Sequence, residues 1–136
     1  MVTYALDSSA VLRYLDREAG ASRVSEIIKG HLAARHKVII SAIHWGEVAL
    51  ITAKGHGRQA VELVLARLWS FGFEIVPATA ERAVRASLIK FKRDIPYADA
   101  FGVELVSDSG DHILVTADVD LKAAAHDVKI EFLPRK

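Results

Sequence analysis

The sequence predicts an α/β fold built on a largely parallel sheet, and three observations lead to this prediction. Short runs rich in β-branched residues alternate with longer amphipathic stretches along the chain, which is typical of strands connected by helices. Turn-forming residues separate these segments. The length of 136 residues matches one domain, and the sequence shows no repeat, low-complexity tract or linker. We therefore expect a single domain over residues 1–136.

The composition of the segments and of the turns between them justifies each element in order. Ser8 and Ser9 open a helix after the first apolar run, Gly55-His56-Gly57 separates two helices, Ile95-Pro96 interrupts the chain before another, and Ser107–Gly110 forms a turn. The predicted strands are Val2–Leu6, Lys37–Ile40, Phe73–Val76, Ile113–Val115 and a fifth at Lys129–Phe132. The predicted helices are Ser9–Leu15, Ser22–Arg35, Ile43–Lys54, Arg58–Ser70, Thr79–Lys92 and Tyr97–Val106.

Composition excludes several classes of protein. Hydrophobic residues make up 51% of the chain, but the longest strongly apolar run, Val38–Ile43, is far shorter than the roughly 20 residues of a membrane span. The absence of cysteine excludes a thiolate nucleophile, a Cys-ligated zinc site and a disulfide framework, so we expect a reducing, cytoplasmic location. The segment Met1–Asp7 lacks the basic start and apolar core of a secretory signal. Lys and Arg total 18 against 17 Asp and Glu, so net charge alone indicates no partner.

Two aspartates directly follow predicted strands. Ligands of parallel sheets bind beyond the carboxyl ends of the strands, so a polar residue at this point is informative. Asp7 follows the first strand, and Asp118 lies in the segment Thr116–Asp120 after the fourth. The alternative for each is an N-cap, because Asp, Ser and Thr side chains accept hydrogen bonds from the free N–H groups at a helix start. The sequence leaves both interpretations open.

Two further acids lie on helix faces that are expected to be apolar. Glu47 shares a face with Ile43, Leu50 and Ile51, so its carboxylate should project along the stripe that packs on the sheet. Asp99 repeats this pattern on the last predicted helix, among apolar neighbours. Burying an unpaired carboxylate costs on the order of several kcal/mol. Each acid should therefore either pair with a buried Arg or Lys or help to bind a metal ion.

Four carboxylates in one cleft would raise each other's pKa unless a divalent cation lay between them. With oxygen ligands only, Mg²⁺ or Mn²⁺ fits better than Zn²⁺. Such a site usually performs phosphoryl chemistry: the metal orients a phosphodiester, activates a bound water as the nucleophile and stabilises the leaving oxygen. The hydroxyls of Ser9 and Thr116 would then hold the attacking water or a carboxylate.

The order of these pieces along the chain is similar to that of a known family. The matching segments are Asp7–Ala10 after the first strand, Glu47 in the helix after the second, Asp99-Ala100 at the start of a late helix, and Leu114–Leu121 near the end. Together they resemble a PIN domain, and within that family the VapC-type toxins of bacterial and archaeal toxin–antitoxin pairs.

This resemblance implies a three-layer α/β/α sandwich with a central, mostly parallel sheet of four to five strands. It also implies an endoribonuclease that depends on Mg²⁺ or Mn²⁺, a homodimer, and a cognate antitoxin protein that blocks the active site. By position, the residues that carry over are Asp7, Glu47, Asp99 and Asp118 as the catalytic and metal-binding quartet, Ser9 and Thr116 as its recurring hydroxyls, and Asp120 as an extra acid that can reach the metal through water.

A basic run precedes Asp99. Lys90, Lys92 and Arg93 are close enough to it to line the mouth of the cleft and bind RNA phosphates, with Phe91 available for stacking. The alternative is a helix C-terminus at which basic side chains interact with free carbonyls. Setting the four acids aside as metal ligands leaves an excess of basic residues, which suits an RNA substrate.

Other signals are weak. The six histidines show no metal-ligand spacing, and His44, three residues before Glu47, is expected to have a packing or surface role. The sequence therefore favours metal-dependent RNA hydrolysis, with Asp7 and Asp99 as the main ligands. The alternative function keeps the PIN-like fold without catalysis, as an RNA- or protein-binding module. Its four acids argue against that alternative, because binding alone has no need for buried carboxylates.

Overall fold

The computed structural model describes residues 1–135. Its elements are β1 (Thr3–Leu6), α1 (Ser8–Leu15), α2 (Ala21–Leu32), β2 (Lys37–Ser41), α3 (Ala42–His56), α4 (Arg58–Ser70), β3 (Glu74–Val76), α5 (Ala80–Arg93), α6 (Tyr97–Val106), β4 (His112–Thr116), the 3₁₀ helix η1 (Val119–Ala124) and β5 (Ile130–Phe132). Every predicted strand and helix is present in the predicted order. No helix within residues 1–135 is both long and apolar enough to cross a membrane.

The ends of most elements differ from the prediction by one or two residues, and two differences are larger. The helix expected to reach Arg35 ends at Leu32, because Ala34 has a left-handed backbone with φ +59° that a helix cannot continue through. The short helix η1 was not predicted, since its six residues are too few to show a clear helical period.

The sheet has the strand order β3-β2-β1-β4-β5. All of its strand pairs are parallel, with Ala5 of β1 opposite Ile39 of β2 and Leu114 of β4. The fifth strand pairs with β4. Because the strands run in the same direction, β1, β2 and β4 end at one edge of the sheet. The residues that directly follow these three strands are therefore brought together.

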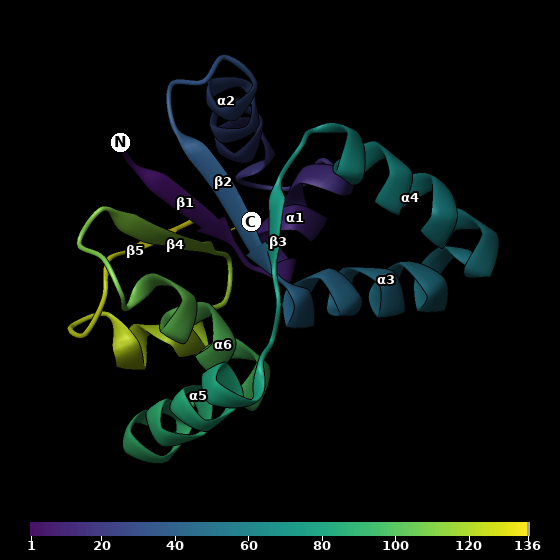
Figure 1. Ribbon diagram of the computed structural model, residues 1–136. Coiled ribbons are helices and arrows are strands. Elements are labelled where there is room, and N and C mark those ends of the chain that lie inside the picture. The colour runs from purple at the N-terminus through teal and green to yellow at the C-terminus, as the bar shows by residue number, and fades with distance from the viewer. Residues whose placement is uncertain (136) are drawn as a thin grey trace.

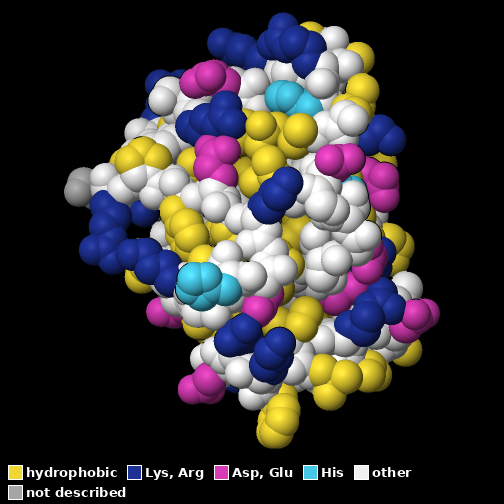
Figure 2. All heavy atoms as spheres, turned by 90° about the vertical axis from the view of Figure 1, so that its left-hand side faces the viewer, with side chains coloured by type: hydrophobic (Ala, Val, Ile, Leu, Met, Phe, Trp, Pro, Cys, Tyr) yellow, Lys and Arg dark blue, Asp and Glu magenta, His cyan; other side chains and the backbone are white. Residues whose placement is uncertain are grey.

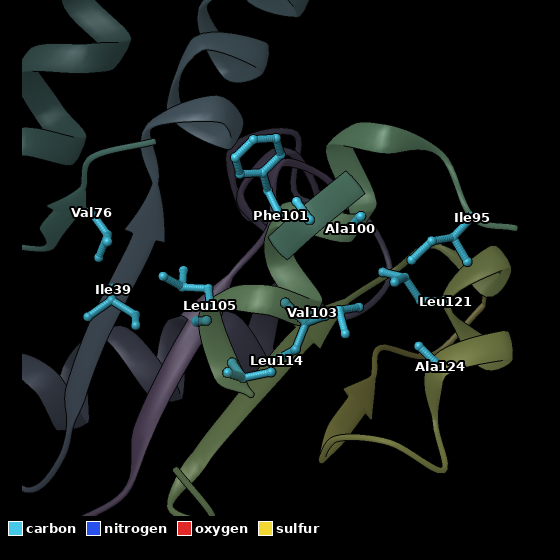
Figure 3. Close-up of a cluster of buried hydrophobic side chains, with 13 residues drawn as sticks. Ile39, Val76, Ile95, Ala100, Phe101, Val103, Leu105, Leu114, Leu121 and Ala124 are labelled. Carbon is cyan, nitrogen blue, oxygen red and sulfur yellow. The ribbon is translucent and has the colours of Figure 1, made fainter. Parts of the chain in front are cut away.

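Side chains on alternate sides of the strands form two cores. Ala5, Ile39 and Leu114 point to one face, where they pack with apolar residues of α5 and α6, including Phe101 and Leu105 (Figure 3). These two helices and η1 form one layer of the molecule.

The opposite face of the sheet carries the second core. Leu6, Val38 and Val115 pack there against α1 and α2, represented by Val11 and Ile27. Helices α3 and α4 extend away from the sheet as an antiparallel pair joined at Gly57 (Figure 1). Helices α5 and α6 lie on the face of the sheet opposite to α1 and α2. This arrangement is the three-layer α/β/α sandwich with a parallel sheet that the sequence predicts.

Candidate metal centre

Asp7 lies where the central strand β1 ends, and it is only 2% exposed. One of its carboxylate oxygens accepts hydrogen bonds from the Ser9 hydroxyl at 2.6 Å and from the Ala10 backbone N–H at 2.9 Å, so the side chain caps α1. The other oxygen accepts a hydrogen bond from Thr116 Oγ1. Burial raises the pKa of Asp7, while nearby His44 and these hydrogen bonds lower it. The N-cap interpretation is thus confirmed, and it leaves Asp7 beside the other candidate acids.

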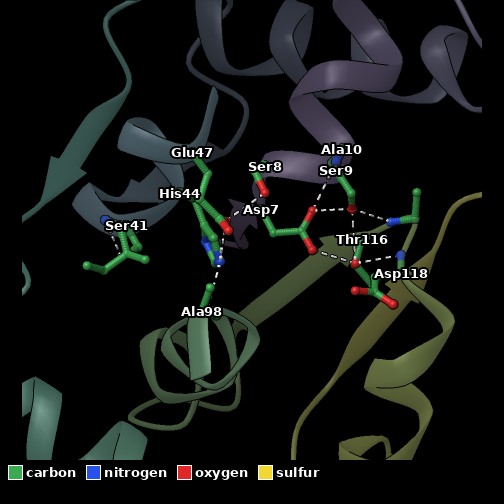
Figure 4. Close-up of polar contacts among 12 residues, drawn as sticks. Asp7, Ser8, Ser9, Ala10, Ser41, His44, Glu47, Ala98, Thr116 and Asp118 are labelled. Atoms are coloured by element: carbon green, nitrogen blue, oxygen red, sulfur yellow. Dashed lines mark hydrogen bonds and ion pairs between the residues drawn. The ribbon is translucent and has the colours of Figure 1, made fainter. Parts of the chain in front are cut away.

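The hydroxyls of Ser9 and Thr116 connect the ends of β1 and β4. Their oxygens are 3.3 Å apart. Ser9 Oγ accepts the backbone N–H of Ala117 at 2.9 Å, and Thr116 Oγ1 accepts that of Asp118 at the same distance. Both hydroxyls therefore orient the Asp7 carboxylate and fix the turn that carries Asp118 (Figure 4).

Asp99 lies in the first turn of α6, which begins directly after Pro96. One oxygen each from Asp99, Asp118 and Asp120 lie within 4.8 Å of one another. Asp99 Oδ2 is buried, and no group in residues 1–135 forms a hydrogen bond with it. Burial, contact with Asp118 and the negative charges of Asp7 and Glu47 raise the pKa of Asp99 to about 8.

Glu47 lies in α3, whose start is capped by the Ser41 side chain. Its carboxylate accepts a hydrogen bond from Ser8 Oγ at 2.9 Å. The side chain is 36% exposed, so the expectation that it projects along the buried stripe of the helix is wrong. Leu50 and Ile51, which were expected to share that stripe, are exposed as well.

The buried stripe of α3 consists instead of His44, Val48 and Thr52. These residues are spaced four apart, so they lie on one side of the helix. Glu47 lies beside this stripe, at the rim of the acidic cluster. The sequence pattern did not distinguish the two sides because α3 is apolar over most of its circumference.

No Lys or Arg within residues 1–135 forms an ion pair with any of the candidate acids. The interpretation of Glu47 and Asp99 as acids paired with buried Arg or Lys is therefore wrong. Clustered carboxylates without a basic partner, an unpartnered buried oxygen and a donor set made only of oxygen atoms fit a hard divalent cation such as Mg²⁺ or Mn²⁺.

The predicted RNA-binding residues lie at the end of α5. Lys90 Nζ donates a hydrogen bond to the Ile95 carbonyl at 3.0 Å, and Arg93 forms a two-pronged ion pair with Asp127. These contacts agree with the alternative in which basic side chains serve the helix end. Lys92 and Phe91 are exposed, so they remain available to a ligand.

Two residues near the acids were not singled out by the sequence. Ser8 holds Glu47, and it lies between two residues that had already been chosen. His44, expected to pack or to lie at the surface, is buried, and its Nε2 lies 2.9 Å from the Ala98 carbonyl and 3.9 Å from Glu47 Oε1. The only signal in the sequence was its spacing of three residues from Glu47.

The parallel sheet with helices on both faces and an acidic cluster beyond its strand ends places this chain among α/β proteins whose candidate site lies at the carboxyl ends of the strands. A model of the PIN domain family matches residues 4–127 of this sequence. The match covers most of the chain, so the chain belongs to the PIN domain family. A search of curated proteins finds no match to this sequence.

Several solved structures share this fold. VapBC2 from Rickettsia felis, bound to a DNA fragment from its promoter, is similar with a TM-score of 0.72 and 16% identity over 96% of this chain and 98% of that chain. DNA-bound VapBC from Salmonella typhimurium has a TM-score of 0.72 and 14% identity over 97% and 98%. VapC20 of Mycobacterium tuberculosis, a toxin that cleaves the sarcin-ricin loop, has a TM-score of 0.68 and 17% identity over 96% and 99%. This similarity concerns the fold.

Proposed function

We propose that this protein is an endoribonuclease that hydrolyses RNA phosphodiester bonds with Mg²⁺ or Mn²⁺. The observation that carries the proposal is the cluster of Asp99, Asp118 and Asp120, in which Asp99 Oδ2 is buried without a partner in the described chain. A carboxylate kept in this state costs folding free energy. Its presence is explained if a divalent cation is the missing partner.

The chain's own residues orient the acids for this role. Asp99, Asp118 and Asp120 would hold the cation, with Asp7 and Glu47 beside them, and the ion would supply a Lewis acid and an activated water. Ser9 and Thr116 fix the Asp7 carboxylate from two sides. Ser8 orients Glu47, which is 36% exposed at the rim of the cluster.

RNA is the proposed substrate, and the proposed location is the cytoplasm. The similar fold of VapC20, named as a toxin that cleaves the sarcin-ricin loop, supports RNA over other phosphodiesters. Exposed Lys92 would contact the phosphates. Lys90 and Arg93 would contribute positive charge from positions held by Ile95 and Asp127.

We propose that a cognate antitoxin is a partner and that the protein is the toxin of a type II toxin–antitoxin pair. The support is the fold shared with VapBC complexes and with a toxin–antitoxin complex from Klebsiella pneumoniae. Co-expression with the product of a short neighbouring gene, followed by co-purification and loss of RNA cleavage, would test this partner.

A homodimer is the proposed oligomeric state. Val84, Leu88 and Phe91 lie on one face of α5 and are 60%, 63% and 89% exposed. Apolar side chains project at the lower end of the space-filling view, where α5 lies in Figure 1 (Figure 2). A second copy of the chain offers the same apolar face, so symmetric pairing would remove both faces from water. Light scattering on the purified protein measures this mass directly.

The proposed activity is tested by Asp7→Asn and Asp99→Asn. Each replaces a carboxylate by an amide of nearly the same shape, so the fold should persist while Mn²⁺-dependent cleavage of RNA is abolished. Asp108→Asn, which changes an exposed aspartate outside the cluster, is the matched control and should cleave like the wild type.

Full cleavage activity in either site variant would overturn the assignment. A wild-type protein that neither cleaves RNA nor binds Mg²⁺ or Mn²⁺ in a calorimetric titration would instead favour the alternative of a binding module without catalysis.

A further inference from the structure

His44 is fully buried between two helices that carry candidate metal ligands. It lies in the first turn of α3, and its side chain is 1% exposed. Its Nε2 lies 2.9 Å from the backbone carbonyl of Ala98 in α6. A carbonyl only accepts hydrogen bonds, so Nε2 carries the proton and donates it. This bond joins α3 to the residue that directly precedes Asp99.

The same nitrogen lies 3.9 Å from Glu47 Oε1, one turn further along α3. The Nε2–H group of His44 therefore faces both the carbonyl of Ala98, the residue before Asp99, and the carboxylate of Glu47. Figure 4 shows the His44 ring between Glu47 and Ala98, on the side of Asp7 away from Thr116. The imidazole thus lies between the parts of α3 and α6 that carry the two acids.

The packing around the ring is close and specific. A Cβ placed on Gly102, one turn after Ala98, would lie 3.2 Å from His44 Cε1 and 3.1 Å from Leu114 Cδ1. Glycine inside a helix lowers its stability relative to alanine. At this position the missing side chain gives the imidazole room to lie against α6.

Packing alone does not explain a histidine here. Nδ1 of His44 is buried, and no group in residues 1–135 forms a hydrogen bond with it. An apolar side chain of similar size would fill the space without leaving a polar atom unpartnered. The cost of keeping an imidazole is explained if its Nε2–H group has a role at the site.

We propose that His44 is a positioning residue of the metal site: its Nε2–H bond to Ala98 sets the distance between the carboxylates of Glu47 and Asp99. The inference rests on the proposed function, because it assumes that Asp99 holds a cation with Glu47 beside it. His44 acts through the backbone and touches neither the cation nor the RNA. Residues that orient metal ligands in this way commonly contribute about 10- to 100-fold to metal affinity or activity.

The test compares His44→Leu with His44→Gln. Leucine fills the space but has no donor, whereas the glutamine amide can donate to Ala98 in place of Nε2. We expect His44→Leu to weaken Mn²⁺ affinity in calorimetry by about 10-fold or more and to lower kcat for RNA cleavage with little change in KM. We expect His44→Gln to recover most of the affinity. Thermal unfolding of the metal-free proteins shows whether both variants fold.

Gly102→Ala provides a second route if His44→Leu does not fold. The added methyl group presses on the imidazole without removing it, so Mn²⁺ affinity should fall in the same direction. Gly46→Ala is the matched control, because a Cβ at this position of α3 meets nothing within 4 Å. It should bind Mn²⁺ as the wild type does.

Wild-type Mn²⁺ affinity and kcat in folded His44→Leu would overturn the inference, as would equal losses in His44→Leu and His44→Gln. Wild-type affinity in Gly102→Ala would do the same if His44→Leu cannot be obtained folded. Failure of the proposed function looks different, because the wild-type protein itself would then show neither Mn²⁺ binding nor cleavage.

Discussion

Helix α6 carries a buried acid, Glu104, and a half-buried one, Asp99, and the two have opposite surroundings. Glu104, near the end of the helix, is 1% exposed and accepts hydrogen bonds from Arg82 at 2.8 and 3.0 Å and from Arg85 at 2.9 Å. Asp99, in the first turn, has acids as its charged neighbours, and its pKa is raised to about 8, mainly by burial. One carboxylate is neutralised within the fold, while the other is not.

The difference shows how a structural acid can be told from a functional one without a bound ligand. A carboxylate that serves the fold alone is paired where it is buried, because an unpaired charge destabilises the folded state. A carboxylate that binds a cation destabilises the metal-free protein, and cation binding removes this destabilisation. We propose that Asp99 is of the second kind, because the described chain gives it no basic partner.

The largest expected change in stability comes from removing the basic partners of Glu104, so that it has none, as Asp99 has none. Replacing both arginines, in Arg82→Met/Arg85→Met, leaves a buried carboxylate without its partners, and we expect the free energy of unfolding to fall by about 3 to 5 kcal/mol. Urea denaturation measures this change. Adding Glu104→Leu should restore most of the stability, since an apolar triad has no charge to compensate. A double variant as stable as the wild type would remove the contrast between the two acids.

A smaller change in stability is expected when Asp99 is replaced by the neutral residue Asn. Its pKa is about 8 in the folded protein against a usual value of 3.8, so the folded state holds more protons than the unfolded state between these values. The stability of the metal-free protein should therefore fall as pH rises from about 4 to about 8.

Asp99→Asn removes this titration and should raise the midpoint of thermal unfolding in EDTA at pH 8 by about 3 to 6 °C. At pH 4 the same change should have little effect. Saturating Mn²⁺ should stabilise the wild type at pH 8 and leave Asp99→Asn nearly unchanged. A stability profile of the wild type that rises from pH 4 to pH 8 would contradict this view of Asp99.

The smallest effect is expected at Glu81. Its carboxylate lies 2.7 Å from Arg85 Nη1, about as close as Glu104 lies to the same arginine, but the Glu81 side chain is 81% exposed. Water screens an exposed pair, so it contributes little to stability, and Glu81→Gln should shift the urea midpoint only slightly. A loss as large as that of the double arginine variant would mean that distance, rather than burial, decides the strength of these pairs.

The sequence predicted the features that depend on local patterns. Strands and their connecting helices follow from the alternation of apolar periods, and Asp7 and Asp118 were identified because they directly follow strands. Parallel strands then bring such residues together without further information. The PIN family match confirms the fold that these patterns indicated.

Features that depend on distant partners were not predicted. Glu104 forms ion pairs with two arginines of α5, and the sequence around Glu104 does not predict this pairing. The predicted orientation of Glu47 was wrong. The buried side of α3 carries His44, Val48 and Thr52, and the apolar residues Leu50 and Ile51 lie elsewhere on the helix. His44 was not chosen because its partner, the Ala98 carbonyl, is a backbone atom of another helix.

The hydrogen bond between Thr116 and Asp7 joins residues that are 109 positions apart in the chain. Strand β4 must pair directly with β1 before this bond can form, although β1 is made well before β4 during synthesis. Closing a loop of this length costs chain entropy, so contacts of such long range slow folding. An incomplete chain that stops before β4 lacks Thr116, Asp118 and Asp120, so a nascent or truncated protein has no assembled acidic cluster. The acidic cluster therefore forms only after β4 has been synthesised and has paired with β1.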